Sequence, residues 1–305
     1  MTDPLVWLPF DAALLGRPPD GLRYETVLPS TSDVPPSADE VEFYVPAYNL
    51  GASQGRLLSM LPRLRVVQTL TAGVEHLRPS VPEGVLLCNG RGIHDASTAE
   101  LAVALSLASL RGIPAFLDAQ RDARWSQDWH ESLADKTVLV LGFGAIGAAI
   151  EARLRPFEVE VVKVARTARD GVHAIEELPA LLPDADVVIL ILPVTNETRG
   201  LVDVEFLGAM KPGALLVNVA RGSIVVTDDL VAALSAGKVR AALDVTDPEP
   251  LPPDHPLWHL PGVIVTPHVG GATPAMWPRA YRLVRDQLER FAAGRPLANV
   301  MTDDY

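Results

Sequence analysis

A glycine-rich turn between a strand and a helix constrains the fold of this chain more than any other feature. The apolar run 137–141 leads directly into the sequence GFGAIG at residues 142–147, and good helix formers follow. Gly142 allows a tight turn, Gly144 lets the backbone approach a pyrophosphate, and Gly147 lets the helix pack closely on the strand. A turn that needs glycine only for its backbone angles is the alternative. The position after a strand and before a helix favours dinucleotide binding.

Apolar runs bounded by Gly or Pro alternate with helical segments along the whole chain, which predicts the α/β class with parallel sheets. The length of 305 residues, 48% of them hydrophobic, favours about two domains. We expect strands at 5–8, 41–45, 66–70, 85–88, 137–141, 159–164, 187–192, 214–219, 241–245 and 263–266. We expect helices at 53–61, 98–110, 228–236 and 274–294. The six later strands predict a doubly wound sheet.

The segment 97–110 predicts a buried helix. Ser97 followed three residues later by Glu100 is typical of a capping box, which places the start of the helix at Ser97. The residues that follow are apolar on nearly every face, so domain packing or a subunit interface must cover them. The 13 residues from Thr98 to Leu110 are too few to span a bilayer, since spanning takes roughly 20 apolar residues.

Composition narrows the function classes. The net charge of -12 disfavours nucleic acid as a partner, and an anionic substrate then requires a local basic residue. Cys88 is the only cysteine, which excludes an intrachain disulfide and favours a cytoplasmic protein. The N-terminus lacks a signal-peptide pattern, and no His/Cys spacing indicates a metal site. We expect neither a membrane association nor a bound metal.

Arg221, Glu249 and His268 each follow one of the last three predicted strands. Ligands of open α/β sheets bind outside the carboxyl ends of the strands. An arginine can clamp a carboxylate through two hydrogen bonds. A histidine beside a carboxylate can be oriented, held protonated, and exchange a proton near neutral pH. Each residue alone has an ordinary structural explanation, but their order after the glycine turn favours an acid–base site.

With these residues in place, the sequence resembles the D-isomer-specific 2-hydroxyacid dehydrogenase family over nearly its whole length. The stretches that carry the resemblance are 139–147, 192–200, 210–214, 218–222, 242–250 and 266–271. The resemblance implies two Rossmann-like or flavodoxin-like domains with a cleft between them. The substrate domain is expected at 1–96, completed by 272–305, and the dinucleotide-binding domain at 97–271. The implied reaction is hydride transfer between NAD(P)H and a small 2-keto or D-2-hydroxy acid, such as glyoxylate or hydroxypyruvate.

The resemblance also implies roles for individual residues. Arg221 corresponds to the substrate-binding arginine, and Glu249 and His268 correspond to the catalytic acid–base pair. The loop Ala72-Gly73-Val74 resembles the one whose backbone amides hold the substrate carboxylate. The residues that the resemblance implies to contact the cofactor are Ile146, Thr198, Val219, Asp244 and Gly270. They join Gly142, Gly144, Ala145 and Gly147, which the glycine turn itself indicates. Members of the family are usually dimers, and we expect the interface near residues 98–130.

One departure from the family pattern concerns the choice of cofactor. NAD-preferring members carry an acidic residue at the end of the second strand of the cofactor domain, where this chain has Ala165 and Arg166. Arg166, Thr167 and Arg169 can surround a 2′-phosphate through charge-assisted hydrogen bonds. A solvated basic loop is the alternative. We therefore expect NADP as the preferred cofactor, with NAD as the second choice.

A second departure is Val226, which stands where many members carry aspartate. Thr227 and Asp228 beside it are expected to cap the following helix. Tyr44, Tyr48 and the loop 125–129 are candidates for lining the cleft, although ordinary core or interface aromatics are an equal alternative.

Two other functions are weighed against the dehydrogenase. A nucleotide-sensing interaction protein, of the corepressor type, uses the same fold, and a fold alone does not decide function. The presence of all three residues Arg221, Glu249 and His268 favours the enzyme. A formate dehydrogenase is the third possibility, but such enzymes pair the histidine with glutamine, and Glu249 argues against it.

Overall fold

The computed structural model describes residues 2–27, 34–48 and 53–302 of the chain. They form two compact units, each with its own sheet. The first contains the residues up to His94 together with those from Pro274 onward, and the second runs from Asp95 to Thr273. The boundaries expected from the sequence, at 96/97 and 271/272, lie two residues away from these.

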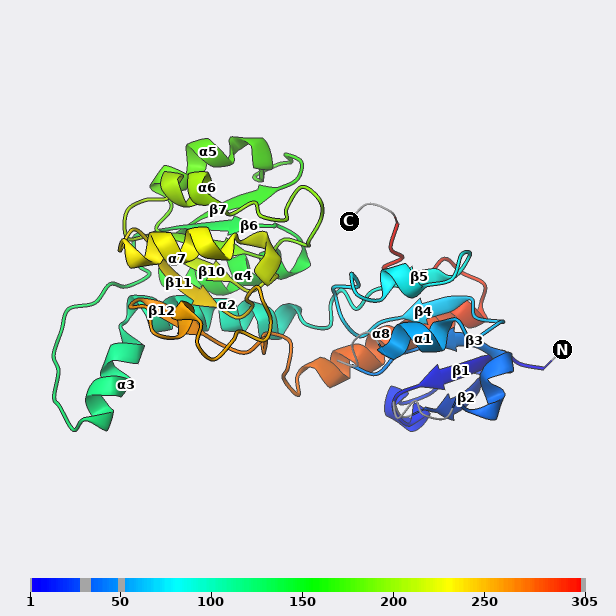
Figure 1. Cartoon of the computed structure of the whole chain (residues 1–305). Coiled ribbons are helices and arrows are strands. Elements are labelled where there is room, and N and C mark those ends of the chain that lie inside the picture. Colours follow the sequence, from blue (N-terminus) through cyan, green and yellow to red (C-terminus); the bar gives the residue numbers. More distant parts are fainter. Residues whose placement is uncertain (1, 28–33, 49–52, 303–305) are drawn as a thin grey trace. The chain divides into compact units, whose positions relative to one another are not determined.

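A parallel sheet with the strand order β2-β1-β3-β4-β5 organises the first unit (Figure 1). The strands are β1 (Leu5–Leu8), β2 (Arg23–Thr26), β3 (Val41–Tyr44), β4 (Val66–Gln68) and β5 (Leu86–Cys88), and the helices are α1 (Ser53–Leu58) and α8 (Met276–Ala292). This order is the flavodoxin-like arrangement of doubly wound folds, which confirms the predicted fold class. The strand β2 was not predicted, because its sequence RYET is polar and lies partly exposed at the sheet edge.

The central strand β1 is apolar throughout because both of its faces are covered. Val6 and Leu8 belong to a core cluster that α8 completes, whereas Leu5 and Trp7 belong to a cluster that α1 completes. Successive side chains of a strand point to opposite faces, so a strand buried on both sides reads as a continuous apolar run.

The C-terminal tail closes the β5 edge of this sheet. Asn89 N donates to Asn299 O at 3.1 Å, and Met301 N donates to Leu87 O at 2.8 Å. Cys88 lies under this tail, has no exposed surface and pairs with Val300 across an antiparallel bridge. Burial raises the pKa of the Cys88 thiol to about 11.

The second unit contains a parallel sheet with the strand order β12-β11-β10-β9-β6-β7-β8 (Figure 1). Its strands are β6 (Thr137–Leu141), β7 (Glu160–Ala165), β8 (His173–Ala174), β9 (Val187–Leu190), β10 (Leu215–Asn218), β11 (Arg240–Leu243) and β12 (Val263–Val265). Its helices are α2 (Asp95–Leu110), α3 (Ile113–Arg121), α4 (Ala145–Leu154), α5 (Leu178–Leu181), α6 (Val204–Ala209) and α7 (Thr227–Ser235). The chain order of the strands reverses between β6 and β9, which is the position where doubly wound sheets bind nucleotides.

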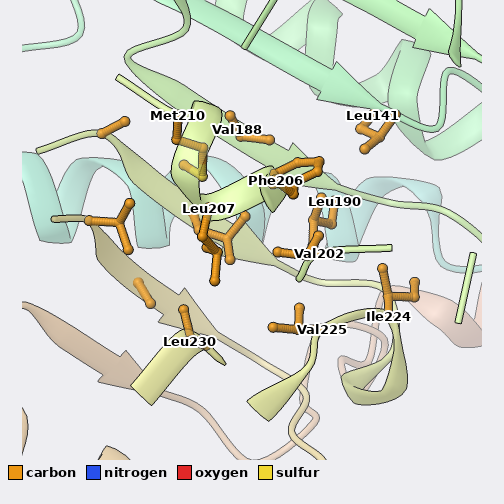
Figure 2. Packing of buried hydrophobic residues seen from close by; sticks show 14 of the residues in the cluster. Leu141, Val188, Leu190, Val202, Phe206, Leu207, Met210, Ile224, Val225 and Leu230 are labelled. Atoms are coloured by element: carbon orange, nitrogen blue, oxygen red, sulfur yellow. The ribbon is translucent and has the colours of Figure 1, made fainter. Parts of the chain in front are cut away.

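The largest core of this unit lies on one face of the sheet. Figure 2 shows Val188 and Leu190 of β9 packed with Phe206 and Leu207 of α6, and all of these are buried. The opposite face is covered by α2 and α4, which share a second cluster with alternate residues of β6 and β9. The sheet is therefore buried on both faces, as a doubly wound fold requires.

Helix α2 begins at Asp95, so the predicted start at Ser97 and its capping box are wrong. Ser97 lies inside the first turn, and its hydroxyl bonds Thr273 Oγ1 at 2.6 Å. Because its hydroxyl bonds Thr273, which is distant in sequence, Ser97 does not cap the helix. The local sequence pattern does not reveal this partner. The predicted burial of the helix is confirmed, because Ala99 and Ala102 are fully covered within their own unit.

Helix α3 and the segment after it project from the body of the second unit (Figure 1). Ile113 and Leu117 are exposed, and the side chains of Trp125 and Trp129 are almost completely exposed. Within the described part of the chain, a single helix that could cross a membrane is not found. The bent pair of α2 and α3 has the necessary length and composition only when the two are taken together, with a 65° bend at their break.

An ion cluster lies where several strands of this unit begin. Glu131 accepts from Lys136 Nζ at 2.5 Å and from Arg240 Nη2 at 2.8 Å, and Asp186 accepts from Lys211 Nζ at 2.8 Å. Partial burial alone raises the pKa of Asp186, but the Lys211 hydrogen bond and the neighbouring positive charges outweigh it and lower that pKa. The pKa of Glu131 is lowered in the same way, with Lys136 as the principal partner opposing burial.

This cluster predicts a loss of stability in acid. A carboxyl whose pKa is lower in the folded state stabilises the fold above its unfolded pKa, and the contribution disappears as the pH falls through the folded value. This stabilisation is therefore lost below about pH 4, and it amounts to about 1 kcal/mol or less for each partly exposed ion pair. Thermal unfolding of Asp186→Asn should show a lower midpoint than wild type at pH 7 and a smaller drop at pH 3. The exposed Asp170→Asn serves as the matched control, and a parallel pH profile in Asp186→Asn and wild type contradicts the prediction.

Candidate functional site

The glycine turn joins β6 to α4 at the point where the strand order reverses. Gly142 has a φ of 110°, and a side chain there would meet the backbone of Ile191 at 2.5 Å. A Cβ at Gly147 would meet Gly142 O at 2.7 Å, whereas one at Gly144 would meet no protein atom within 4 Å. The structure therefore needs Gly142 for the turn and Gly147 for helix packing, while the side of Gly144 is open to an approaching group.

Helix α4 offers its N-terminus at this open side, with Gly144 at the N-cap and no side chain capping it. The first N–H groups of a helix have no intrahelical acceptor and favour an anion. In α4 these groups belong to Ala145, Ile146 and Gly147. The residues present therefore fit the pyrophosphate of a dinucleotide.

The loop after β7 brings basic side chains to the glycine turn. Arg169 donates from Nη2 to the carbonyl of Phe143, and its guanidinium lies 5.9 Å from the centre of that ring. Lys163 Nζ of β7 lies 5.5 Å from the same ring centre. Arg166 and Thr167 are exposed in this loop. Phe143 and Lys163 were not singled out by sequence reasoning, because nothing local predicts that the two cations converge on that ring.

Glu249 and His268 meet at the carboxyl ends of neighbouring strands. They follow β11 and β12, and His268 Nδ1 lies 2.6 Å from Glu249 Oε1. A carboxylate can only accept, so Nδ1 carries the proton and Nε2 is the nitrogen that can exchange one with another molecule. Both side chains are nearly half exposed, which keeps them accessible to a substrate and to water.

Asp244 holds the loop that carries His268. Its buried carboxylate accepts from Thr266 Oγ1 at 2.6 Å, from Val269 N at 2.9 Å and from Gly270 N at 2.8 Å. Its carbonyl accepts from His268 N at 2.7 Å. These bonds fix His268 with a φ of 54°, a left-handed conformation that is unfavourable for residues with a side chain. Sequence reasoning named Asp244 only as a cofactor contact and missed this positioning role.

Arg221 follows β10, the strand next to β11 in the same sheet. Its Nη1 donates to Ala220 O at 2.7 Å, and its carbonyl accepts from Asn218 Nδ2 at 3.0 Å. Gly222 packs directly on the backbone before Glu249, since a Cβ there would lie 1.9 Å from Thr246 O. The structure thus joins the turn of Arg221 to the loop that carries Glu249.

The start of α7 differs from the expectation. Val226 occupies the N-cap and makes no capping hydrogen bond, so the predicted capping by Thr227 or Asp228 is wrong. The Thr227 hydroxyl donates instead to Asp247 O at 2.6 Å. It therefore ties the helix to the loop of Glu249, a long-range partner that the local sequence does not indicate.

In the first unit, two carbonyls of the loop after β4 are bound by the segment after β5, and a third is bound within the loop itself. Thr71 O accepts from Gly90 N at 2.7 Å, Ala72 O accepts from Asn89 Nδ2 at 2.9 Å, and Gly73 O accepts from Thr71 Oγ1 at 2.8 Å. In a planar trans peptide the N–H points away from the carbonyl. The amides of Ala72 and Gly73 are therefore turned away from these contacts, as an anion-binding loop requires.

The remaining predicted residues are cofactor-contact candidates and candidates for lining the cleft. Thr198 uses its hydroxyl inside its own turn, donating to Pro193 O at 2.7 Å, and Val219 is buried directly after β10. Tyr44 lies in the core, edge-on to Trp7 at 6.1 Å, and so is a core aromatic. Tyr48 lies 5.3 Å from the ring of His94.

Comparisons with known proteins agree with this geometry. The model of the D-isomer specific 2-hydroxyacid dehydrogenase NAD binding domain matches residues 103–270. The chain is 36% identical over 225 residues to a glyoxylate reductase/hydroxypyruvate reductase of Mus musculus, which covers 69% of this chain and 68% of that protein.

Solved structures match over nearly the full length. A D-isomer specific 2-hydroxyacid dehydrogenase from Xanthobacter autotrophicus Py2, in complex with NADPH and MES, is 30% identical. It covers 99% of this chain and 98% of its own, with a TM-score of 0.83. An NADPH-dependent glyoxylate/hydroxypyruvate reductase from Sinorhizobium meliloti, in complex with NADP and sulfate, is 26% identical. It covers 97% of both chains, with a TM-score of 0.82.

The family model covers the glycine turn, the histidine–carboxylate pair and all the strands of the second sheet. The chain therefore belongs to the D-isomer specific 2-hydroxyacid dehydrogenase family.

Proposed function

We propose that this protein reduces small 2-keto acids of the glyoxylate and hydroxypyruvate type to D-2-hydroxy acids, with NADPH as the preferred hydride donor. The observation that carries the proposal is the 2.6 Å contact of His268 Nδ1 with Glu249 Oε1, in the same unit as the glycine turn. Relatives that are glyoxylate/hydroxypyruvate reductases support the substrate class. In this reading, the first unit is the substrate domain and the second binds the dinucleotide.

The chain's own residues then have separate tasks. The reduced nicotinamide, when bound, supplies the hydride that C2 of the keto acid accepts. Protonated His268 gives its Nε2 proton to the oxygen on C2, so that the carbonyl becomes a hydroxyl, and solvent reprotonates the exposed ring. Glu249 fixes the ring and stabilises its positive charge. Arg221 and the amides of Ala72-Gly73-Val74 bind the carboxylate and orient C2.

The cofactor is held by the glycine turn and the loop after β7. Gly144, Ala145, Ile146 and Gly147 receive the pyrophosphate, and Thr198, Val219, Asp244 and Gly270 make further contacts with the cofactor. Asp244 can still do so, because its Oδ2 accepts one protein hydrogen bond and an oxygen can accept two. The proposal thus assigns Asp244 both a loop-holding and a cofactor role.

The geometry favours an enzyme over a nucleotide-sensing protein. A sensor needs the dinucleotide site, but sensing does not require a histidine hydrogen-bonded to a carboxylate in the same unit. The carboxylate partner also disfavours a formate dehydrogenase, which pairs its histidine with glutamine.

The test is a panel of 2-keto acids assayed with NADH and with NADPH. Wild-type enzyme should oxidise NADPH in the presence of glyoxylate or hydroxypyruvate, and Arg221→Ala should raise KM for the keto acid. Nucleotide binding without turnover of any 2-keto acid would refute the reductase and favour the sensor.

We predict that NADPH is used in preference to NADH. Arg166 and Arg169 provide positive charge beside the glycine turn, where a 2′-phosphate gains charge-assisted hydrogen bonds of roughly 1.5–3 kcal/mol each, or about tenfold or more in affinity. Arg166→Ala should lower kcat/KM for NADPH and leave that for NADH unchanged. The exposed Arg155→Ala, in the same unit but outside the predicted dimer interface, is the matched control. Equal use of both cofactors by the wild type contradicts the prediction.

We also predict a symmetric homodimer formed near residues 98–130. Burying the exposed Ile113, Leu117, Trp125 and Trp129 against a second copy removes a large apolar surface from water. Light scattering at micromolar concentration should give twice the chain mass, and the double variant Trp125→Ser/Trp129→Ser should shift the mass toward the monomer. A monomeric wild type removes this part of the proposal.

A further inference from the structure

We infer that Asn89 is a positioning residue for the substrate carboxylate, acting through one peptide plane of the loop after β4. The inference rests on the proposed function, in which the amides of this loop bind the carboxylate. Asn89 follows β5, the strand next to β4, and is nearly buried. Its Nδ2 donates to Ala72 O at 2.9 Å.

This hydrogen bond determines where the amide of Gly73 points. The 72–73 peptide bond is trans, and a trans peptide is planar with its C=O and N–H directed to opposite sides. With the carbonyl held by Asn89, the N–H of Gly73 must face the other way. Rotating that plane would break the bond and leave a buried amide donor unsatisfied, which is costly.

Asn89 is itself held on several sides. Its Oδ1 accepts from Arg91 N at 3.2 Å, so the side-chain amide cannot flip without losing that bond. Its backbone carbonyl accepts from the fully buried Gln68 Nε2 at 3.0 Å. Gln68 in turn accepts from Gln287 Nε2 of α8 at 2.7 Å. A chain of buried amides therefore links helix α8 to the residue that orients the loop.

The backbone next to Asn89 packs so closely on the loop after β4 that the loop cannot shift toward it. A Cβ at Gly90 would lie 2.7 Å from the carbonyl of Leu70, and Gly90 N donates to Thr71 O at 2.7 Å. The two segments thus touch backbone to backbone, and only glycine permits this approach. The Gly90 contact fixes the distance between the segment of Asn89 and the loop. The Asn89 hydrogen bond therefore sets the direction of the 72–73 peptide rather than merely filling space.

The test compares Asn89→Asp and Asn89→Ala with Asn299→Ala in the full-length enzyme. Asn89→Asp preserves the shape and the acceptor for Arg91 but replaces the donor to Ala72 by an oxygen. Asn299 donates to the backbone carbonyls of Asn89 and Arg91. Its variant therefore loosens the segment around Asn89 but keeps the Asn89 Nδ2 donor to Ala72 O. Circular dichroism and thermal unfolding establish that each variant is folded.

We expect both Asn89 variants to raise KM for glyoxylate about tenfold or more, the weight of a hydrogen bond to a charged group. The value of kcat and the KM for NADPH should be unchanged, because the histidine and the dinucleotide site lie in the other unit. The dissociation constant of oxalate from the enzyme with NADPH, measured by calorimetry, should rise in parallel. Asn299→Ala should lower the unfolding midpoint and leave KM unaltered.

The inference is overturned if folded Asn89→Asp retains the wild-type KM and oxalate affinity, or if Asn299→Ala reproduces the rise in KM. In that event an effect of Arg221→Ala on KM would leave the proposed function standing. A wild-type enzyme that reduces no 2-keto acid overturns both.

Discussion

Replacing His268 by alanine is expected to lower kcat by a factor of about 10²–10⁴, the usual weight of a general acid. The Nε2 proton of His268 is the one placed to reach the substrate oxygen, since Nδ1 is engaged by Glu249 at 2.6 Å. Glu249→Gln should reduce kcat as well, because an amide holds the ring in place but no longer offsets its charge. Steady-state assays at saturating keto acid and NADPH measure both effects.

The exposed histidine His259, in the same unit, gives the matched control. His259→Ala should keep the wild-type kcat. Comparing it with His268→Ala then shows whether the loss of kcat is specific to His268. NADPH binding, followed by fluorescence, should be the same in His268→Ala and wild type, because the glycine turn is not altered. Wild-type turnover in folded His268→Ala would remove this residue from the mechanism.

Gly222→Ala is expected to abolish activity and to destabilise the fold. A Cβ at this position would lie 1.9 Å from Thr246 O and 2.1 Å from its carbonyl carbon, and neither backbone segment is a flexible side-chain end that can move aside. Overpacking of this kind costs about 1–3 kcal/mol or more. Relief requires Arg221 and Glu249 to move apart, so kcat/KM should fall further than the loss of stability alone explains.

Gly208→Ala is the matched control for this prediction. Gly208 lies in helix α6, and its added Cβ would meet only the end of Lys238, at 3.8 Å. Alanine in a helix is more favourable than glycine by about 0.5–1 kcal/mol. Chemical unfolding and activity should therefore separate the two variants, and a Gly222→Ala protein as stable and active as Gly208→Ala would contradict the close approach seen in the structure.

Most of the fold could be predicted because its strands are buried on both faces. The runs 5–8 and 137–141 match β1 and β6 to the residue, since a continuous apolar run bounded by breakers has few other uses. The strands β2 and β8 escaped prediction because they are short, polar and at the edges of their sheets. The start of α2 was misplaced because Ser97 bonds a residue distant in sequence.

The candidate site was predictable where one residue type signals its own chemistry. The glycine turn and the residues at the strand ends are of that kind, and the structure brings Glu249 and His268 into contact. The residues that hold them in place were not predictable as such. Asp244 accepts hydrogen bonds from the loop of His268, and Asn89 donates a hydrogen bond to the separate loop after β4. Both pairings join segments that meet only in the folded chain, and no sequence pattern indicates them.

The buried Cys88 thiol provides a way to measure how often the first unit opens. It is the only thiol of the chain, and thiol reagents attack the thiolate, which is scarce at neutral pH when the pKa is about 11. Labelling therefore requires the tail that pairs with β5 to detach and the sheet edge to open. Because the second unit contains no cysteine, the rate of modification by a disulfide reagent reports the opening of the first unit alone. Following that rate with and without a keto acid analogue would show how strongly a ligand bound at the loop after β4 keeps this edge closed.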